Sequence, residues 1–322
     1  MMNDIAVSIV CITYNHEKYI KDCLDGFLMQ KTNFEYEIIV HDDASTDRTQ
    51  RIIRDYELKN PKKIRVIYQN ENKYSKGIEI MKEYISPLVR GKYVAICEGD
   101  DYWIDENKLQ QQFDSLEQNK DCMMCVSKVQ GVNPDKSTII GCTYPNKIIN
   151  NKMNLEEYLK KEYRYLFQTS SFFCRASEWL VFNNNPPIFR KVSMVGDVPL
   201  VLYMLTKGNI SYIDSTMSNY RRLTPGSFGS RTIYDRKRRV MQSKSYFDMM
   251  NAFSDYIDKK YDCNIKKYEF DYEFIRGNYH YLLSKEMRNI FKIQKTKRKA
   301  FIILCYFFPF FDFLLTKKIE RN

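Results

Sequence analysis

The chain has 322 residues, of which 44% are hydrophobic and 28% are charged, and its formal net charge is +11 at pH 7. This length allows two ordinary domains or one large α/β unit with an appendage, and this composition excludes disorder as the default state. The excess Lys and Arg lie mainly in 221–239, 259–267 and 285–299. Such clusters bind phosphates, although a solvated basic helix is the simpler explanation of any single cluster. No helix-turn-helix, zinc-finger or RNA-binding pattern accompanies them, so no nucleic-acid partner is expected.

Nine cysteines are scattered along the chain. Cys11 and Cys97 fall in predicted strands, where a thiol behaves as a small hydrophobic group. Cys122 and Cys125 have C-x-x-C spacing, but no second pair stands at zinc-finger distance, so a zinc site is not expected there. The first residues show no signal-peptide pattern, which favours a chain that stays in the reducing cytoplasm.

The first hundred residues alternate between predicted strands and helices. Strands are predicted at 7–12, 36–40, 64–68 and 93–98, and helices at 18–30, 49–60 and 78–89. This alternation is typical of a doubly wound parallel sheet, in which ligands gather outside the carboxyl ends of the strands where strand order reverses. Polar segments follow three of the strands, at 13–15, 42–47 and 98–101. We therefore expect these three segments to surround one ligand site.

The segment Glu98-Gly99-Asp100-Asp101 places three carboxylates directly after the fourth strand. Oxygen ligands select Mg²⁺ or Mn²⁺, and Mg²⁺ is usually held by one or two carboxylates together with substrate phosphates. A nucleoside diphosphate is then the natural ligand. The alternative is an acidic turn that caps the following helix, because Asp and Glu are common at helix starts.

The second half of the chain has mixed signals. Helices are predicted at 106–119, 153–165, 176–182 and 199–206, and strands at 122–142 (one or two), 168–175, 210–213 and 217–222. The loop 224–230 is flexible in composition and suits a lid. Beyond 232 the pattern changes to amphipathic helices rich in Tyr, Lys and Arg. We therefore predict a domain at 1–231, with a nucleotide-binding half at about 1–115 and an acceptor half at about 116–231, and a helical, basic and aromatic region at 232–322.

Residues 300–315 form a strongly apolar and aromatic run with Lys and Arg on both sides. A spanning helix needs about 20 apolar residues, and this run is shorter and contains Pro309 and Asp312. A basic aromatic segment suits the membrane interface instead. Packing against the protein's own helices is the alternative explanation.

The three polar segments, in their order and spacing, resemble those of family 2 glycosyltransferases over about residues 5–230. The resemblance implies the GT-A fold, a Rossmann-like mixed sheet flanked by helices, here with a C-terminal helical extension. It also implies an inverting, metal-dependent transfer of a sugar from a nucleotide donor to an acceptor hydroxyl. In the nucleotide pocket, Tyr14 would stack on the base and Asp43 would accept the base N–H. Their supporting residues would be Thr13, Asn15, Asp42, Ser45 and Asp47.

The segment Glu98-Gly99-Asp100 stands where this family carries its D-x-D metal motif. The resemblance therefore makes Asp100 the ligand of Mn²⁺ or Mg²⁺ and places Asp101 beside the sugar. Glu98 differs from the usual Asp but keeps the charge. Gly99 separates the two acidic positions within the donor site.

Three residues outside these segments complete the predicted site. Asp197 lies where the family has an acidic residue before a helix, and we predict that it is the general base that removes the acceptor proton. Capping of the helix 199–206 is its alternative role. Lys76 can approach the donor diphosphate, although a solvated loop lysine is the simpler explanation. Arg221 resembles part of a family segment that closes over the donor, where a cation neutralises leaving-group charge.

These residues predict a glycosyltransferase that uses a nucleotide-diphosphate sugar, a UDP- or dTDP-sugar by preference. The predicted acceptor is a lipid-linked saccharide of a capsule, O-antigen or related surface polymer, reached by a cytoplasmic enzyme held peripherally at the inner face of the plasma membrane. One alternative is a nucleotidyltransferase that makes the sugar nucleotide, but the segment after the first strand lacks the glycine-rich loop of such enzymes. The other is a non-catalytic nucleotide-sugar-binding module.

Overall fold

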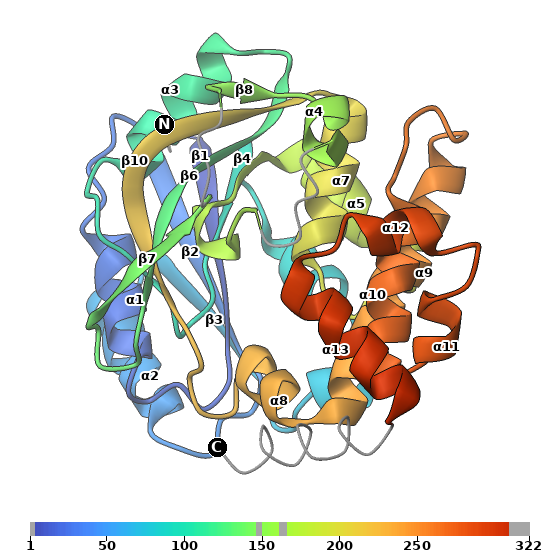
Figure 1. The fold of residues 1–322 in the computed structure, drawn as a ribbon. Helices are drawn as coiled ribbons and strands as arrows, with labels where there is room; N and C mark the ends of the chain where they lie inside the picture. The colour runs from blue at the N-terminus through green and yellow to red at the C-terminus, as the bar shows by residue number, and fades with distance from the viewer. Residues whose placement is uncertain (1–3, 146–149, 161–165, 309–322) are drawn as a thin grey trace. The chain divides into compact units, whose positions relative to one another are not determined.

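The computed structural model describes residues 4–145, 150–160 and 166–308 (Figure 1). The described residues pack into two compact units. Those within 1–158, 163–186 and 200–222 make up the first unit, and those within 159–162, 187–199 and 223–322 make up the second. The domains predicted at 1–231 and 232–322 are continuous stretches of sequence, whereas the compact units combine separate stretches. The two domains therefore remain a prediction.

The first unit is built on a parallel sheet, as predicted. Its strands are β1 (Ile5–Thr13), β2 (Glu35–Asp42), β3 (Ile64–Tyr68) and β4 (Tyr93–Ile96). They stand in the order β3-β2-β1-β4, and β1 pairs in parallel with both β2 and β4. Strand order therefore reverses at β1. The carboxyl ends of β1 and β4 lie at this switch point, where α/β sheets bind ligands.

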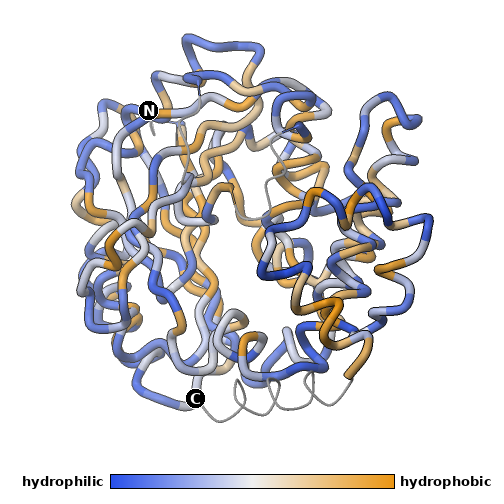
Figure 2. The backbone as a smooth tube through the Cα atoms, viewed as in Figure 1, coloured by the Kyte–Doolittle hydropathy of each residue, from blue (hydrophilic) through white to orange (hydrophobic). Residues whose placement is uncertain are grey.

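Helix α1 (Ile20–Leu28) covers the sheet because its apolar residues recur at helical spacing. Ile20, Cys23, Leu24 and Phe27 are all fully buried. They share a core with the apolar residues of β1 and β2, and Figure 2 shows these strands in the hydrophobic colours. Helix α2 (Thr49–Lys59) packs on α1 and β3. The loops that follow β1, β2 and β4 thus start from a rigid base.

Strands of both directions complete the sheet, which among the described residues has ten strands. These strands are β5 (Tyr102–Trp103), β6 (Cys122–Val132), β7 (Thr138–Tyr144), β8 (Lys152–Met153), β9 (Phe173–Arg175) and β10 (Asn209–Arg221). Strand β9 pairs antiparallel with β4, whereas β6 and β10 pair in parallel. The helices α3 (Lys108–Gln118) and α5 (Ala176–Asn184) belong to this unit, whereas α4 (Leu155–Lys160) and α7 (Asp197–Lys207) each have residues in both units. The expected mixed α/β fold is confirmed.

Several predicted elements need correction. The helix predicted at 78–89 is a π-helix, η2 (Met81–Ile85), followed by a 3₁₀ turn, η3 (Ser86–Leu88). Pro87 lacks the N–H that a regular α-helix would need there. The strands predicted at 210–213 and 217–222 are one strand, β10, because register shifts after Ile213 and Thr216 keep it paired with β6. The strand predicted at 168–175 begins with the 3₁₀ turn η4 (Thr169–Ser171), and residues 161–165 of the helix predicted at 153–165 lie outside the described residues.

The second unit is helical, as the composition predicted for its C-terminal part. Its helices are α6 (Ile188–Lys191), α8 (Phe228–Tyr234), α9 (Arg236–Tyr256), α10 (Ile265–Arg276), α11 (Tyr279–Leu282), α12 (Arg288–Lys292) and α13 (Thr296–Phe307). Phe270, Leu282, Met287 and Ile302 form a buried core between α10 and α13. The loop predicted at 224–230 is shorter than expected, because α8 begins at Phe228 and Ser227 caps it by accepting the N–H of Ser230.

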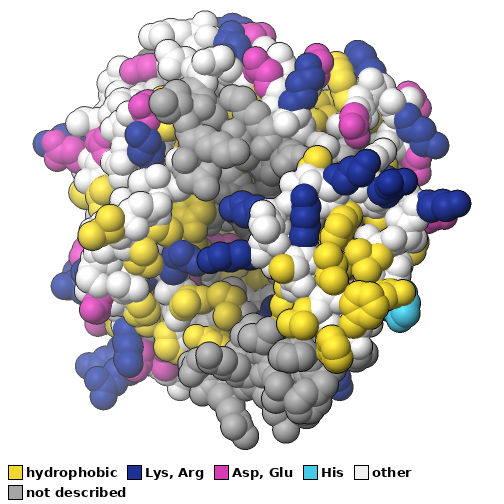
Figure 3. All heavy atoms as spheres, viewed as in Figure 1, with side chains coloured by type: hydrophobic (Ala, Val, Ile, Leu, Met, Phe, Trp, Pro, Cys, Tyr) yellow, Lys and Arg dark blue, Asp and Glu magenta, His cyan; other side chains and the backbone are white. Residues whose placement is uncertain are grey.

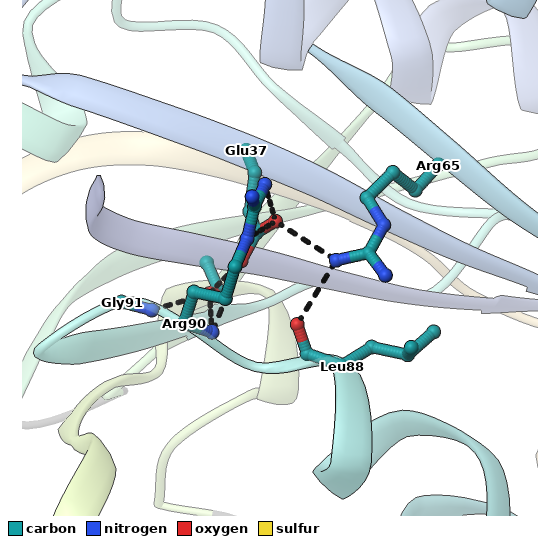
Figure 4. Close-up of polar contacts among 6 residues, drawn as sticks. Glu37, Arg65, Leu88, Arg90 and Gly91 are labelled. Carbon is teal, nitrogen blue, oxygen red and sulfur yellow. Dashed lines mark hydrogen bonds and ion pairs between the residues drawn. The ribbon is translucent and has the colours of Figure 1, made fainter. Parts of the chain in front are cut away.

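A buried carboxylate joins the strands at their amino ends, away from the switch point. Glu37 accepts a hydrogen bond from the Ser8 hydroxyl at 2.7 Å, from Arg90 Nε at 2.9 Å and from an Arg90 terminal nitrogen at 2.6 Å. The serine bonds to Oε1, whereas both Arg90 nitrogens bond to Oε2, which Arg65 approaches at 3.5 Å (Figure 4). This cluster connects β1, β2, β3 and the segment that leads into β4.

Candidate donor-binding site

The loops after β1 and β2 are joined to each other by hydrogen bonds. The N–H of Asn15 donates to Ser45 Oγ at 2.8 Å, and Asn15 Oδ1 accepts the N–H of Thr46 at 2.8 Å. Glu17 N–H similarly donates to Asp47 at 3.1 Å. Asn15 and Ala44 both have positive φ, near +55° and +63°, a conformation that Asn tolerates well. Asn15, Ser45 and Asp47, predicted from sequence as pocket residues, thus hold the two loops together.

The two carboxylates at the end of β2 also stabilise loops. Asp42 accepts the Ser45 N–H at 3.0 Å and Gln50 Nε2 at 2.7 Å. Asp43 accepts the backbone N–H groups of Lys73 at 2.7 Å and Tyr74 at 3.0 Å, one on each oxygen. Each carboxylate oxygen can accept a second bond. The predicted contact of Asp43 with a base therefore stays a prediction, and its contacts fix the segment 73–74 beside it.

The acidic loop after β4, residues 98–101, lies against the loop after β1. Gly99 N–H donates to the carbonyl of Ile12 at 3.0 Å, and Asp101 N–H donates to the carbonyl of Glu98 at 3.0 Å. A Cβ at position 99 would stand 2.5 Å from Thr13 Oγ1, so glycine is required for this close approach. Thr13, Gly99 and the acidic residues thus lie together, and their shared role in binding a ligand stays a prediction.

The three acidic side chains of this loop differ in exposure. Glu98 is exposed, whereas Asp100 is 8% exposed and Asp101 is 2% exposed. Burial, together with the neighbouring charges of Asp100 and Glu98, raises the pKa of Asp101 well above its usual value. Asp101 accepts the backbone N–H of Arg221 at 2.9 Å. Glu98 is therefore the exposed carboxylate of this loop, and Asp100 is less deeply buried than Asp101.

The carboxylates of this loop suit a hard cation whose remaining ligands would come from a bound nucleotide and water. Among residues 4–145, 150–160 and 166–308, no group of three or more His, Cys, Asp or Glu side chains is arranged to hold a metal. One or two carboxylates at a strand end are nevertheless the usual protein contribution to a Mg²⁺ site whose other ligands are phosphate oxygens and water. Glu98 and Asp100 have this chemistry. A zinc-type cage is not what the described residues offer.

The remaining predicted residues have different surroundings. Tyr14 is 42% exposed, as a ring that stacks on a base must be. Lys76 pairs with Glu71, which also pairs with Lys73, and these hydrogen bonds lower the pKa of Glu71 to about 2. Lys76 is 53% exposed at its side chain.

Asp197 belongs to the second unit, at the first residue of α7. Its carboxylate accepts the N–H of Val198 at 2.8 Å, and burial raises its pKa. The side chain of Arg221, by contrast, is completely buried in the first unit. Its guanidinium forms an ion pair with Asp22 and donates a hydrogen bond to the carbonyl of Asp100. Sequence reasoning missed Asp22, because its partner lies 199 residues away and no local pattern connects them.

A sequence profile described as "Glycosyl transferase family 2" matches residues 8–179, which is more than half of the chain. The chain belongs to glycosyl transferase family 2. An uncharacterised protein of Mycobacterium tuberculosis is 30% identical to this family 2 chain over 242 residues, which cover 74% of the chain and 65% of the relative. The chain thus spans about two thirds of the length of that relative.

Two further similarities extend over most of the family 2 chain. The UDP-Glc:α-D-GlcNAc-diphosphoundecaprenol β-1,3-glucosyltransferase WfgD of Escherichia coli is 27% identical over 278 residues, covering 84% of this chain and 98% of WfgD. The mannosyltransferase PcManGT of Pyrobaculum calidifontis, solved in complex with GDP-Man and Mn²⁺, matches with a TM-score of 0.53 at 12% identity, covering 99% of this chain and 86% of that chain. The fold of the family 2 chain is accordingly the GT-A fold, as the sequence predicted.

Proposed function

We propose that this family 2 chain is an inverting, metal-dependent glycosyltransferase that moves a sugar from a nucleoside-diphosphate sugar to a saccharide hydroxyl. The observation that carries the proposal is the acidic loop at the switch point of the sheet, where Glu98 is exposed next to a nearly buried Asp100. Loops from β1 and β2, joined through Asn15 and Ser45, border the same end of the sheet. This is the end at which α/β sheets bind nucleotides.

Glu98 and Asp100 would hold Mn²⁺ or Mg²⁺ together with the oxygens of the donor diphosphate. When bound, such a cation stabilises the negative charge of the departing diphosphate. Tyr14 would stack on the base, and Asp43, Thr13 and Lys76 would line the nucleotide side. A UDP- or dTDP-sugar is our preferred donor, and the UDP-Glc in the name of WfgD supports this class.

Asp197 would be the general base that takes the proton of the acceptor hydroxyl. Its pKa is raised by burial, and a base whose pKa lies nearer to the working pH removes a proton more effectively. Because the unprotonated carboxylate is the active form, transfer should fall as the pH drops through this raised pKa. The loss should therefore begin at a higher pH than for an ordinary aspartate.

The acceptor would be a lipid-linked saccharide of a surface polymer. WfgD, by its name, acts on a sugar carried by diphosphoundecaprenol, which is a lipid-linked acceptor. A lipid-linked acceptor requires an enzyme that works at a membrane surface. No helix in the described ranges has the length and apolarity that a membrane crossing requires.

Helix α13 offers a surface for peripheral attachment at the inner face of the plasma membrane. Ile302 and Cys305 face its own unit's core, whereas Ile303, Leu304, Phe307 and Phe308 are exposed. Lys295 and Lys297 are exposed at the start of the same helix. Figure 3 shows hydrophobic side chains with basic side chains beside them on the helical second unit. Apolar and cationic groups on one helix face suit an anionic lipid surface. Residues 309–315 of the predicted segment lie outside the described residues.

Binding to vesicles tests this attachment. Replacing Leu304 and Phe307 by Ser should lower sedimentation of the chain with vesicles that contain anionic phosphatidylglycerol. The matched control is Leu58→Ser, because Leu58 is 79% exposed on α2 of the first unit. Equal sedimentation of all three proteins would remove the membrane proposal and leave the transferase proposal intact.

A thermal-shift screen with sugar nucleotides, with and without Mn²⁺, tests the donor and the cofactor, since a ligand that binds the native state raises apparent stability. Asp100→Asn should abolish the part of the shift that depends on Mn²⁺. Asp197→Asn should keep donor binding and lose transfer by orders of magnitude, which separates an enzyme from a binding module. Release of pyrophosphate from a nucleoside triphosphate and a sugar 1-phosphate would instead identify a nucleotidyltransferase.

A further inference from the structure

Arg221 makes an unusual set of contacts at the end of β10. Its guanidinium donates to the carbonyl of Asp100 at 2.6 Å and forms a short ion pair with Asp22 of α1. Its backbone N–H donates to the carboxylate of Asp101 at 2.9 Å. The side chain has no exposed surface. One residue thus contacts two successive residues of the acidic loop and the helix behind them.

Aromatic rings and an ion pair make this buried charge tolerable. The guanidinium carbon lies 4.4 Å from the ring centroid of Tyr102 and 5.0 Å from that of Tyr19. Both distances are within the range of cation–π attraction. Asn219, two residues before Arg221, donates to the hydroxyl of Tyr102 at 2.8 Å. A buried guanidinium keeps its charge, so it must retain these partners to remain inside the fold.

We propose that Arg221 is a positioning residue, which fixes the main chain of the acidic loop so that the carboxylate of Asp100 presents its oxygens to the donor-bound cation. This inference rests on the proposed function. Arg221 would act through Asp100 and Asp101 and would not itself touch the donor. The sequence-based prediction, in which Arg221 neutralises the leaving group, gives the same residue a different task, so the two can be separated by experiment.

Geometry explains why such a residue is needed. The loop turns sharply at Gly99, and β4 already ends at Ile96. Strand β10 therefore supplies the support from the other side, through the backbone and the side chain of the same residue. Groups that orient a metal ligand typically change metal affinity or activity by about 10–100-fold when they are removed.

Asp22 links this arrangement to a residue that provides a control. Its second oxygen accepts Lys136 Nζ at 2.6 Å, from the turn between β6 and β7. Lys136 is 52% exposed, and besides its pair with Asp22 its Nζ lies 5.8 Å from the centroid of the Tyr102 ring, farther than the guanidinium carbon of Arg221. The Asp22 side chain is 21% exposed, and an ion pair that is open to solvent on its lysine side contributes little. Removing Lys136 should therefore alter the charge near Asp22 without altering the loop.

The test measures binding of Mn²⁺ and of UDP, and it does not depend on turnover. Free Mn²⁺ is followed by electron paramagnetic resonance in the presence of UDP, and UDP binding is measured separately in EDTA. Arg221→Lys keeps the charge but cannot contact Asp22 and the Asp100 carbonyl with the same fork of donors. We expect its dissociation constant for Mn²⁺ to rise at least about tenfold, with metal-free UDP binding unchanged. Lys136→Ala should bind Mn²⁺ as the wild type does, within about twofold.

Asp22→Asn is the second variant, because it leaves Arg221 in place and changes only its partner. It should weaken Mn²⁺ binding in the same direction. The fluorescence of the two buried tryptophans, Trp103 and Trp179, should verify that each variant is folded. Wild-type Mn²⁺ affinity in either folded variant would overturn the inference. Loss of metal-free UDP binding in Arg221→Lys, but not in Asp22→Asn, would overturn it in favour of a direct donor contact. A wild-type chain that binds neither Mn²⁺ nor UDP would instead overturn the proposed function itself.

Discussion

Replacing a solvent-exposed arginine usually changes stability little, but the buried carboxylate of Glu37 predicts a large loss when Arg90 is replaced. Glu37 is 1% exposed at its side chain, whereas Arg90 is 53% exposed and Arg65 is 39% exposed. Without the arginines the carboxylate would be a buried charge with few partners, whereas the arginines without the carboxylate can be solvated by water. Removing Arg90 should destabilise the fold more than neutralising Glu37.

The contacts set the magnitudes. In Glu37→Gln, the retained oxygen can still accept from Ser8 and from the Arg90 N–H at 3.1 Å, while Arg90 loses two charge-assisted bonds and turns to solvent. We expect a loss of about 2 kcal/mol in the free energy of unfolding. In Arg90→Ala, one buried carboxylate oxygen keeps only the 3.5 Å contact with Arg65, and the loss should be about 3–5 kcal/mol. The double variant should resemble Glu37→Gln, at about 2 kcal/mol.

Urea unfolding followed by tryptophan fluorescence measures these differences. Both tryptophans, Trp103 and Trp179, lie in the first unit, so the signal reports on the unit that contains the cluster. Glu106→Gln is a matched control, because its pair with Lys31 is exposed and should change stability by less than about 1 kcal/mol. If Arg90→Ala lost no more than Glu37→Gln, or if the two losses simply added, the reasoning from burial would be refuted.

Two further predictions concern the surroundings of the acidic loop. Lys108 is fully buried over the ring of Trp103, and burial lowers its pKa from 10.5 to about 8. The unfolded chain then binds more protons between about pH 8 and pH 10.5, so this lysine should make stability rise with pH by roughly 3 kcal/mol across that window. Urea unfolding of the wild type and of Lys108→Met at pH 7.5 and pH 10 should reveal the rise as a difference between them, and parallel pH curves would contradict it. Gly99→Ala should weaken Mn²⁺-dependent UDP binding at least about tenfold, because the added Cβ would collide with Thr13 and shift the acidic loop. The control is Gly196→Ala, because a Cβ at position 196 meets open space. Equal losses of binding in both variants would rule out this steric explanation.

Local patterns were sufficient for the parallel half of the sheet. Strands β1 to β4 lie where alternation and β-branched residues predicted them, and β1, β2 and β4 are almost wholly buried, whereas β3 at the end of the strand order is only partly buried. Prediction was weaker where pairing is decided by distant strands. Strand β10 stays paired with β6 across the register shifts after Ile213 and Thr216, which no local pattern shows. Within the helix expected at 78–89, Pro87 cannot donate the hydrogen bond that a regular α-helix would need there.

The amino-acid sequence by itself determined the fold class and the acidic loop, since periodicity, turn residues and the order of three short segments are local properties of the chain. Only the tertiary structure decided what individual side chains do there. Asn15 and Asp43 hold loops together through hydrogen bonds with residues 30 or more positions away, and Arg221 donates to the carbonyl of Asp100 from a position 121 residues later. A hydrogen bond depends on the distance and angle between donor and acceptor in space, and the separation of two residues in the sequence does not determine either.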